Sequence, residues 1–422
     1  MKVVLAPVGT RGDVQPMVAL AVALQERGHT VLLVTSAAFE TLARQWNVPF
    51  LAAGQDVQAW TEQHAREVSR HPIRRVRALN QMLKEEIRGQ FEVLVESTRG
   101  ADFLIGAGLQ FAGPSVAEAA GVPYRYAIYA PQVLESDEHP APIVPCPHLP
   151  RLLNRVSWWL FRKLYNAVFR GKVNRYRASL GLAPCSDFLR MTMPDNSFLA
   201  ADVELVPLPS RCRQSPVVTG SWILPDREPL PADLERFLDQ GPPAIFFGLG
   251  SMTDPDRAAT SELVLQAARA VGRRLVLSRG WAGYELPQPA TDAFVIGAVN
   301  HQRLFPRVAA VVHHGGAGTV SAAARAGAPQ IIVPHLGDQF VHARRMHQLG
   351  VAPLPFNRRQ LSFERLSAAL RHVLETPSVA MTAAALGKDL RQKNGARAAV
   401  EQLEADVSET RSIRQWKQGQ AP

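Results

Sequence analysis

Residues 311–339, VVHHGGAGTVSAAARAGAPQIIVPHLGDQ, carry the clearest structural pattern in this 422-residue chain. A β-branched run ends at His313-His314, and four small residues, 315–318, lead into an alanine-rich segment. This order predicts a strand that turns through glycines into the N-terminus of a helix. A second strand is expected at 330–333, followed by a loop that ends in Gly337-Asp338-Gln339.

A glycine turn that opens a helix is a site suited to phosphate. Glycines let backbone N–H groups approach a ligand, and the first helical turn offers unpaired donors and partial positive charge. The sequence therefore predicts a phosphate site at this turn. Asp338 and Gln339, in the loop after the next strand, lie where they can bind hydroxyls of a sugar joined to that phosphate.

The composition is that of a large α/β protein. A chain of 422 residues exceeds one core and predicts two domains. The three cysteines, Cys146, Cys185 and Cys212, are widely spaced and odd in number, which indicates a reducing compartment. The sequence shows no signal peptide and no apolar run long enough to span a bilayer, so we expect a cytoplasmic protein.

The formal net charge of +10 is unevenly distributed. Residues 151–177 contain eight Lys and Arg and no Asp or Glu, and apolar residues recur there at helical spacing (Leu153, Val156, Leu160, Leu164 and Phe169). We expect an amphipathic helix that packs on its own domain with a solvated basic face. The alternative is peripheral contact with the inner face of an anionic membrane. No motif of a nucleic-acid reader is present, so nucleic acid is not an expected partner.

Alternating strands and helices predict two doubly wound domains. The first series begins with a strand at 2–8, a turn at Gly9–Asp13 and a helix from about Val14. The second series begins near residue 217 and contains the 311–339 stretch. We assign 1–215 to an N-terminal acceptor domain, 216–395 to a C-terminal donor domain, and 396–422 to a helix and tail that return to the N-terminal domain.

The carboxyl ends of parallel strands form the binding edge of such domains. The turn Gly9–Asp13 follows the first strand and should therefore point into a cleft between the domains. The Pro-rich stretch 131–150 is expected to be a loop over the same cleft.

HHGGAGT, the later GDQ, and GTRGDVQP at 9–16 together resemble the signature of nucleotide-sugar glycosyltransferases with the GT-B fold. The chain is similar to the bacterial and fungal branch of the UDP-glycosyltransferase superfamily, which includes sterol, macrolide, glycopeptide and rhamnolipid glycosyltransferases. The resemblance implies an α/β fold of two Rossmann-like domains that face a cleft.

The resemblance implies a general base and a leaving-group site. It assigns the base to Asp13, while the alternative is that Asp13 only caps the following helix. It assigns contacts with the diphosphate to the imidazole of His313, with His314 structural, and to the turn that follows: Gly315, Gly316, Ala317, Gly318 and Thr319. Arg11 is assigned to the donor side of the cleft.

Other donor contacts follow from weaker matches. Ser251 ends an FGS-like motif at 247–252, and Trp281, Val299 and His301 lie where relatives bind the base and ribose. Asn300 departs from the proline that is usual before His301, which leaves base recognition open.

Three other motifs suggest different chemistry. Asp254-Pro255-Asp256 is formally a metal-binding DxD, but it precedes a helix that it can cap, and GT-B enzymes need no bound metal, so none is expected. Residues 248–253 resemble a degraded dinucleotide fingerprint, but Arg279 stands near the end of the next strand in place of an acidic ribose partner. The histidines form no zinc-ligand pattern.

These assignments predict an inverting, metal-independent hexosyltransferase. The expected donor is UDP-glucose, and the acceptor is a hydroxyl of a lipophilic small molecule such as a sterol or hopanoid, a polyketide, a carotenoid or a hydroxy-lipid. The alternatives are a transferase of TDP-deoxysugars, a sugar-nucleotide epimerase on the same fold, and a catalytically silent homologue that activates a partner.

Overall fold

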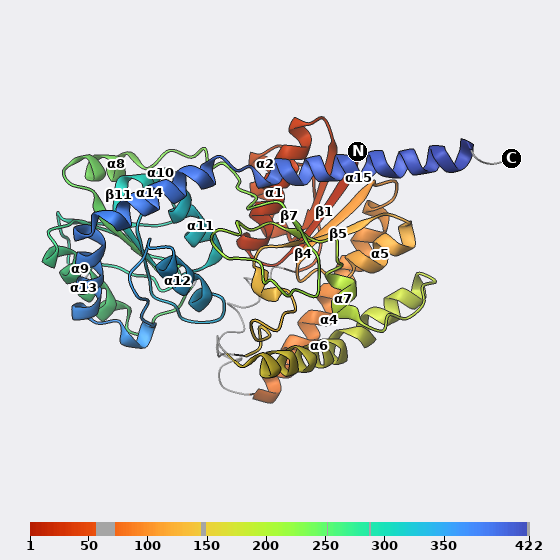
Figure 1. The fold of residues 1–422 in the computed structure, drawn as a ribbon, viewed down its shortest axis with the longest axis horizontal. Helices are drawn as coiled ribbons and strands as arrows, with labels where there is room; N and C mark the ends of the chain where they lie inside the picture. The colour runs from red at the N-terminus through yellow and green to blue at the C-terminus, as the bar shows by residue number, and fades with distance from the viewer. Residues whose placement is uncertain (56–71, 145–148, 251, 287, 420–422) are drawn as a thin grey trace.

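The computed structural model describes residues 1–55, 72–144, 149–250, 252–286 and 288–419. It has two lobes, and each is built on a parallel sheet (Figure 1). The predicted α/β class with two doubly wound domains is confirmed.

The N-terminal sheet has seven strands in the order β3-β2-β1-β4-β5-β6-β7, all parallel. Its central strands are buried on both faces, which explains why they are continuous apolar runs without alternation. The strands are β1 Lys2–Val8, β2 Thr30–Thr35, β3 Phe50–Ala52, β4 Phe103–Gly108, β5 Tyr124–Ile128, β6 Phe198–Leu199 and β7 Val217–Val218. The helices of this lobe are α1 Arg11–Glu26, α2 Glu40–Gln45, α4 Pro72–Ser97, α5 Gly113–Ala120, α6 Arg151–Ser179 and α7 Phe188–Thr192.

The C-terminal sheet has five parallel strands in the order β10-β9-β8-β11-β12. They are β8 Ala244–Gly248, β9 Leu275–Ser278, β10 Ala293–Ile296, β11 Val308–His313 and β12 Gln330–Ile332. The helices are α8 Ala232–Asp239, α9 Arg257–Ala270, α10 His301–Leu304, α11 Ala317–Ala326, α12 Gln339–Gln348, α13 Phe363–Glu375 and α14 Pro377–Arg391. In each sheet the strand order reverses beside the first strand of the domain, between β1 and β4 and between β8 and β11. In this class of fold, ligands bind at the carboxyl ends of the strands at that point.

The last helix, α15 (Gly395–Gly419), leaves the C-terminal lobe and lies along the N-terminal lobe (Figure 1). Its apolar side chains Ala396, Ala399, Val400 and Leu403 are buried in the same cluster as α1. Glu404 of α15 also binds His29, with 2.8 Å between Oε1 and Nε2. We also expected Ile413 and Trp416 to face this lobe, but they lie outside the residues whose side chains are described.

Two boundaries differ from those expected. The strand Val217–Val218 pairs within the N-terminal sheet, so that sheet extends past the expected domain end at residue 215. Helix α1 begins at Arg11 rather than Val14, because the Thr10 hydroxyl accepts the N–H of Gly12 and so caps the helix earlier.

A buried ion pair joins the two lobes. Asp202 follows the N-terminal strand β6, and its side chain is fully buried. Its two carboxylate oxygens lie 2.8 and 3.1 Å from Nη2 of Arg325, which belongs to α11 of the C-terminal lobe. Leu205 and Val206 pack beside it against Val320 and Ile332. The position of α11 relative to the N-terminal lobe therefore depends on this pair.

We expect Asp202→Ala to lower the free energy of unfolding by about 3–5 kcal/mol, because it leaves the Arg325 guanidinium buried beside fewer acceptors. Asp195→Ala is the control, since Asp195 forms an exposed pair with Arg190 and should cost at most about 1 kcal/mol. Urea denaturation measures both. Equal effects of the two variants would show that the buried pair does not hold the lobes.

Candidate functional site

Asp13 lies at the carboxyl edge of the N-terminal sheet, between the ends of β1 and β4. A Cβ on Gly9 would come within 2.2 Å of Asp13 Oδ2, and a Cβ on Gly108 within 3.0 Å of Oδ1. Both glycines have positive φ, +150° and +63°. A larger residue at position 9 would displace this carboxylate, and one at position 108 would also clash with the Val8 carbonyl at 2.1 Å.

The two oxygens of Asp13 have different surroundings. Oδ2 accepts the backbone N–H of Thr10 at 2.8 Å and the Thr10 hydroxyl at 3.2 Å, which completes a capping box at the start of α1. Oδ1 accepts no hydrogen bond from any residue that the structure describes. Burial raises the pKa of Asp13, and the Thr10 bonds partly oppose this. One oxygen thus caps the helix while the other stays available for a proton.

His313 is the last residue of β11 and is fully buried. Its Nδ1 accepts the N–H of Gly315 at 3.1 Å, so Nε2 carries the proton and donates to Gln330 Oε1 at 2.9 Å. Burial lowers the pKa of His313 to about 3. Both ring nitrogens are engaged inside the protein, so the expected contact of this imidazole with a diphosphate is not supported by its geometry.

His314 has the opposite character. Its ring lies against two turns, because a Cβ on Gly316 would sit 2.4 Å from His314 Nε2 and a Cβ on Gly250 would sit 2.7 Å from Cε1. Its Nδ1 has no hydrogen-bond partner among the described residues, although that atom is buried. Burial lowers the pKa of His314 to about 4. A neutral imidazole with an unused nitrogen thus faces the turn that we expected to hold phosphate.

The turn at 315–318 opens helix α11, as predicted. Gly315 has φ +91°, and a Cβ there would come within 2.8 Å of Ile332, so only glycine fits. Gly316 is the N-cap and offers no side chain, which leaves the first N–H groups of α11, Ala317, Gly318 and Thr319, without a side-chain acceptor. His342 donates to the Gly315 carbonyl at 2.8 Å and fixes the turn from α12.

Asp338 and Gln339 begin helix α12 and differ in availability. The Asp338 side chain is 40% exposed and makes no capping hydrogen bond. Gln339 is buried, and its Oε1 accepts the N–H groups of His335 at 2.8 Å and Leu336 at 3.2 Å. Gln339 therefore holds its own loop, whereas Asp338 is free to meet a ligand.

The remaining expected donor residues lie on neighbouring loops of the C-terminal lobe. The Trp281 side chain is half-exposed, and the backbone N–H of Trp281 donates to the carbonyl of Gly250 at 2.9 Å. His301 stacks on Phe305 with 4.5 Å between ring centroids. Burial, with the positive charge of Arg11 as a smaller cause, lowers the pKa of His301 to about 4. Arg11 is therefore near His301, and the start of α1 faces the start of α10.

The other two positions show where the motif matching was too coarse. Val299 is partly buried in the apolar cluster under α10. Asn300 caps α10 by accepting the N–H of Arg303 at 3.0 Å, and it donates to the carbonyls of Asp226 and Glu228 in the linker. Asn300, which stands where proline is usual, therefore connects the linker to the C-terminal lobe through these hydrogen bonds. Ser251 lies outside the described residues.

The DxD-like motif forms a buried polar cluster. Asp254 pairs with Arg358 at 2.8 Å and accepts the hydroxyls of Thr260 at 2.7 Å and Tyr284 at 2.8 Å. Its oxygens are occupied inside the protein, so its role is to join three elements rather than to cap α9 with its side chain. No group of three or more potential metal-binding side chains occurs in the described part of the chain.

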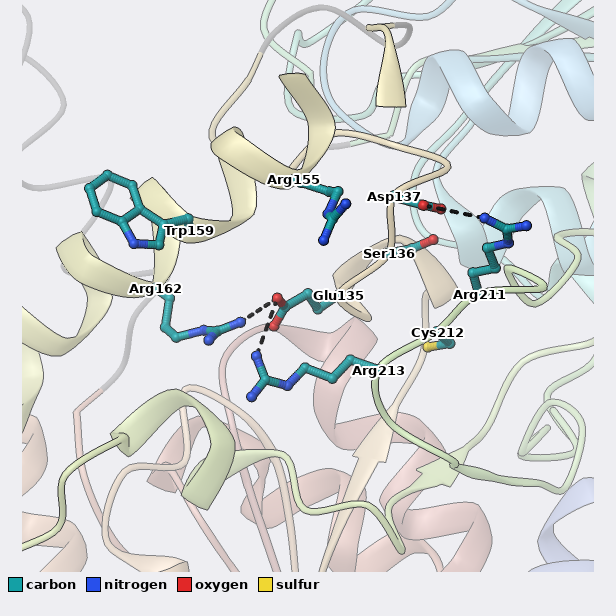
Figure 2. A pocket seen from close by; sticks show the side chains of 9 residues that line it. All are labelled: Glu135, Ser136, Asp137, Arg155, Trp159, Arg162, Arg211, Cys212 and Arg213. Atoms are coloured by element: carbon teal, nitrogen blue, oxygen red, sulfur yellow. Dashed lines mark hydrogen bonds and ion pairs between the residues drawn. The ribbon is translucent and has the colours of Figure 1, made fainter. Parts of the chain in front are cut away.

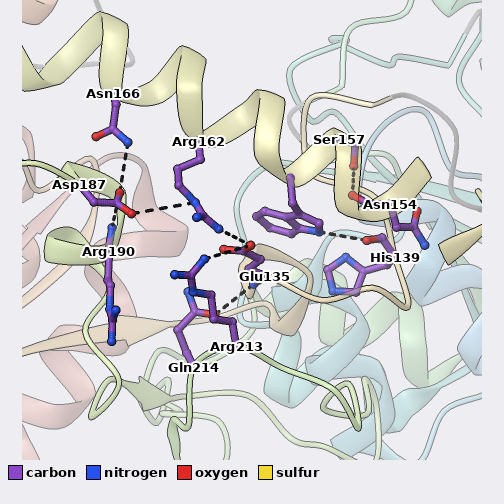
Figure 3. Close-up of polar contacts among 11 residues, drawn as sticks. Glu135, His139, Asn154, Ser157, Arg162, Asn166, Asp187, Arg190, Arg213 and Gln214 are labelled. Carbon is purple, nitrogen blue, oxygen red and sulfur yellow. Dashed lines mark hydrogen bonds and ion pairs between the residues drawn. The ribbon is translucent and has the colours of Figure 1, made fainter. Parts of the chain in front are cut away.

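Helix α6 differs from the expected amphipathic helix. Its aromatic side, with Trp158, Phe161, Tyr165 and Phe169, packs on its own lobe. Figure 3 shows polar contacts that fasten this side to the 131–150 loop, among them the ion pair of Arg162 with Glu135. Asn154 also donates to the Asp137 carbonyl at 2.9 Å.

The aliphatic residues on which that expectation rested are mostly exposed. The face they form is exposed at Leu152, Leu153, Val156, Trp159, Leu160, Leu164 and Val168. The helix thus packs on its own lobe with most of its basic residues exposed, as expected, but it does so through its aromatic residues and not through these aliphatic ones. No helix in the described part of the chain has the length and apolarity needed to cross a bilayer.

The comparisons with known proteins follow the same two-lobe division. Residues 3–136 match the model of the glycosyltransferase family 28 N-terminal domain, and residues 286–405 match that of the erythromycin biosynthesis protein CIII-like C-terminal domain. The chain is 38% identical to the vancomycin aglycone glucosyltransferase of Amycolatopsis orientalis, over 94% of this chain and 96% of that protein. The chain belongs to the UDP-glycosyltransferase superfamily.

This glycosyltransferase is also similar to a plant enzyme and to solved structures. It is 31% identical to the sterol 3-beta-glucosyltransferase UGT80B1 of Arabidopsis thaliana, over 95% of this chain and 67% of that protein. Among solved structures, the spinosyn forosaminyltransferase SpnP superposes with a TM-score of 0.72 at 17% identity, over 97% of this chain and 99% of that one. The fold of this nucleotide-sugar glycosyltransferase is thus GT-B.

The sequence analysis of this glycosyltransferase did not foresee the different surroundings of His313 and His314. Adjacent histidines look alike in sequence, but strand alternation sends their side chains to opposite faces. The pairing partner of β11 carries Gln330, an amide able to satisfy a buried imidazole, and this was the available signal that His313 faces inward.

We expect the stability of the glycosyltransferase to fall as pH drops below 6.5. The pKa of His313 is about 3 when folded, against an ordinary value of 6.5, so the unfolded chain binds the proton first. Each such histidine contributes a slope of up to about 1.4 kcal/mol per pH unit in this window. His313→Asn should reduce the slope of unfolding free energy against pH, measured by urea denaturation from pH 4 to 7. His372→Asn, at an exposed position on α13, should leave the slope as in the wild type, and an unaltered slope in His313→Asn would contradict the assignment.

Proposed function

We propose that this glycosyltransferase is inverting and moves a hexose from a nucleoside diphosphate to a hydroxyl of a natural-product acceptor. The observation that carries the proposal is the pairing of two groups at facing edges of the lobes. One is a half-buried carboxylate with a free oxygen, Asp13, and the other is an uncapped helix N-terminus beside a neutral imidazole, His314.

In the proposed reaction, Asp13 Oδ1 accepts the proton of the acceptor hydroxyl as its oxygen bonds the anomeric carbon. The bond from that carbon to the diphosphate oxygen breaks on the opposite face. A carboxylate is suited to this step because its raised pKa brings it closer to the working pH.

The leaving diphosphate carries the negative charge that the other lobe stabilises. We assign this role to the N–H groups of Ala317, Gly318 and Thr319 and to the His314 imidazole, in place of His313. Fixed donors of this kind act strongly because they need no reorganisation as charge develops. Asp338 is the residue we assign to the hydroxyls of the sugar. No metal is required in this scheme.

The donor is proposed to be UDP-glucose, with a TDP-deoxysugar as the second candidate. The name of the glucosyltransferase relative supports glucose, whereas a relative 36% identical over 88% of this chain is a dTDP-epi-vancosaminyltransferase. A panel of both donors against glycopeptide, polyketide and sterol acceptors, analysed by mass spectrometry for the added sugar mass, tests the proposal. Absence of transfer in the whole panel, with isomerised sugar nucleotide as product, would favour an epimerase instead.

We expect Asp13→Asn to lower kcat by about 10²–10⁴-fold with little change in donor affinity, because the amide caps α1 but accepts no proton. The wild-type rate should fall with decreasing pH as Asp13 is protonated, over a range above its ordinary pKa of 3.8. Asp102→Asn, at the opposite edge of the same sheet, is the control. Stopped assays across pH measure both, and full activity in Asp13→Asn would remove the base assignment.

We expect His314→Ala to lower kcat by about 10–10³-fold without loss of stability, because it removes a partner of the diphosphate and leaves the β11–β12 contact intact. His313→Ala should instead lower the free energy of unfolding, since it leaves Gln330 buried without its partner. Steady-state kinetics and urea denaturation on both variants measure the contrast. The reverse pattern would restore His313 as the diphosphate ligand.

A further inference from the structure

A cavity of about 550 Å³ lies on the N-terminal lobe, and none of the candidate site residues described above lines it. Three segments line it: the loop after β5 with Glu135 and Asp137, helix α6, and the stretch Arg211–Arg213 (Figure 2). The loop leaves the carboxyl edge of the sheet, which is also the edge that holds Asp13. The volume is that of a small-molecule site.

The lining of this cavity is positively charged. The lining contains four arginines (155, 162, 211 and 213) and two carboxylates, and Arg162 also pairs with Asp187 outside the lining at 4.0 Å. Glu135 pairs with Arg162 and Arg213, and Asp137 lies 3.9 Å from Arg211. Arg155 has no partner within ion-pair distance among the described residues, and Figure 2 shows it reaching from α6 toward the loop. Its guanidinium is the group available to an anion.

An aromatic ring lies beside this free arginine. Trp159 is one helical turn beyond Arg155, lines the same cavity and is 58% exposed. Lys163 lies over the Trp159 ring, with 5.9 Å from Nζ to the centroid, which adds positive charge at its face. Val156 and Leu160 extend the exposed apolar surface along α6. The cavity therefore presents an apolar face and a free cation side by side.

The chain connects this cavity to the reaction site over a short span. The Tyr129 hydroxyl donates to the Asp13 carbonyl at 3.1 Å, and Glu135 lies six residues further along. Six residues extend at most about 20 Å, so a ligand of the size of a large natural product spans both places.

We propose that this cavity is an acceptor subsite that binds an acidic group, a carboxylate, next to an aromatic or aliphatic face of the acceptor. Arg155 pairs with the acid and Trp159 stacks on the apolar portion. The identification of the ligand as the acceptor rests on the proposed function. The anion site itself is inferred from the cavity and the charges that line it. A lining built from three segments, two of which supply arginines, favours a carboxylate of a discrete ligand over a flat lipid surface.

The test uses 2-naphthoate and its neutral amide, 2-naphthamide, as probes of the intact protein. We expect the carboxylate to bind about threefold to tenfold more tightly than the amide in NMR titrations, an advantage that is reduced by salt. Arg155→Gln should abolish this difference, and Trp159→Leu should weaken both probes. Arg175→Gln, at an exposed position on the same helix, is the matched control and should bind both probes as the wild type does.

Two further measurements separate this inference from its rivals. Bound 2-naphthoate should slow alkylation of Cys212, which lines the cavity, but not that of Cys185. Sedimentation with phosphatidylserine vesicles tests a lipid surface, and vesicle binding that depends on Arg155 without any preference for 2-naphthoate would overturn the proposal. Sugar transfer in the donor and acceptor panel without carboxylate preference refutes the subsite alone. Carboxylate preference without any sugar transfer supports the anion site and refutes the proposed reaction alone.

Discussion

The turn between β11 and α11 depends on a single buried imidazole. His313 accepts the Gly315 N–H on one nitrogen and donates to Gln330 of the neighbouring strand on the other. This fixes the backbone where the strand stops and leaves the N–H groups of the helix pointing outward. The arrangement also determines which histidine is free, since the alternation of strand side chains turns His314 to the opposite side. His313 thus fixes the turn with both of its ring nitrogens, while Nδ1 of the neighbouring His314 has no hydrogen-bond partner among the described residues.

At the carboxyl edge of the N-terminal sheet, the side chain fixed by hydrogen bonds is the carboxylate of Asp13. The general-base role that we propose for Asp13 requires a carboxylate that is held in place and can still accept a proton. The capping box uses only Oδ2, and the two glycines at the strand ends leave space around the side chain. Burial then raises the pKa, which the Thr10 bonds limit. The structural and chemical roles of Asp13, which are alternatives in sequence, are therefore compatible because they use different oxygens.

The sequence predicted the parts of the fold that depend on periodicity and on turn chemistry. Strands 2–8 and 309–313 are apolar runs bounded by glycine, and both occur within a residue or two of the expected limits. The errors concern which side of an element meets the core. Gln339 matches a sugar-binding motif, yet its Oε1 accepts two N–H groups of its own loop, which depends on a turn geometry that motif matching does not represent. The hydrogen bond of His313 likewise depends on a partner 17 residues away in the sequence, Gln330, which motif matching does not represent.

Helix α6 shows how much a one-dimensional pattern can hide. Aromatic residues cover one side and aliphatic residues the other, so the helix has two apolar faces where its spacing suggests one. The aromatic face is the buried one because its rings fill the space over the sheet. The indole N–H of Trp158 also donates to the His139 carbonyl, so its polar group is satisfied there. That choice leaves the aliphatic face in water, where a contiguous apolar surface has a free-energy cost unless a ligand or partner covers it. Placed next to an unpaired arginine and an open cavity, that exposed face is best explained as a surface that a ligand completes.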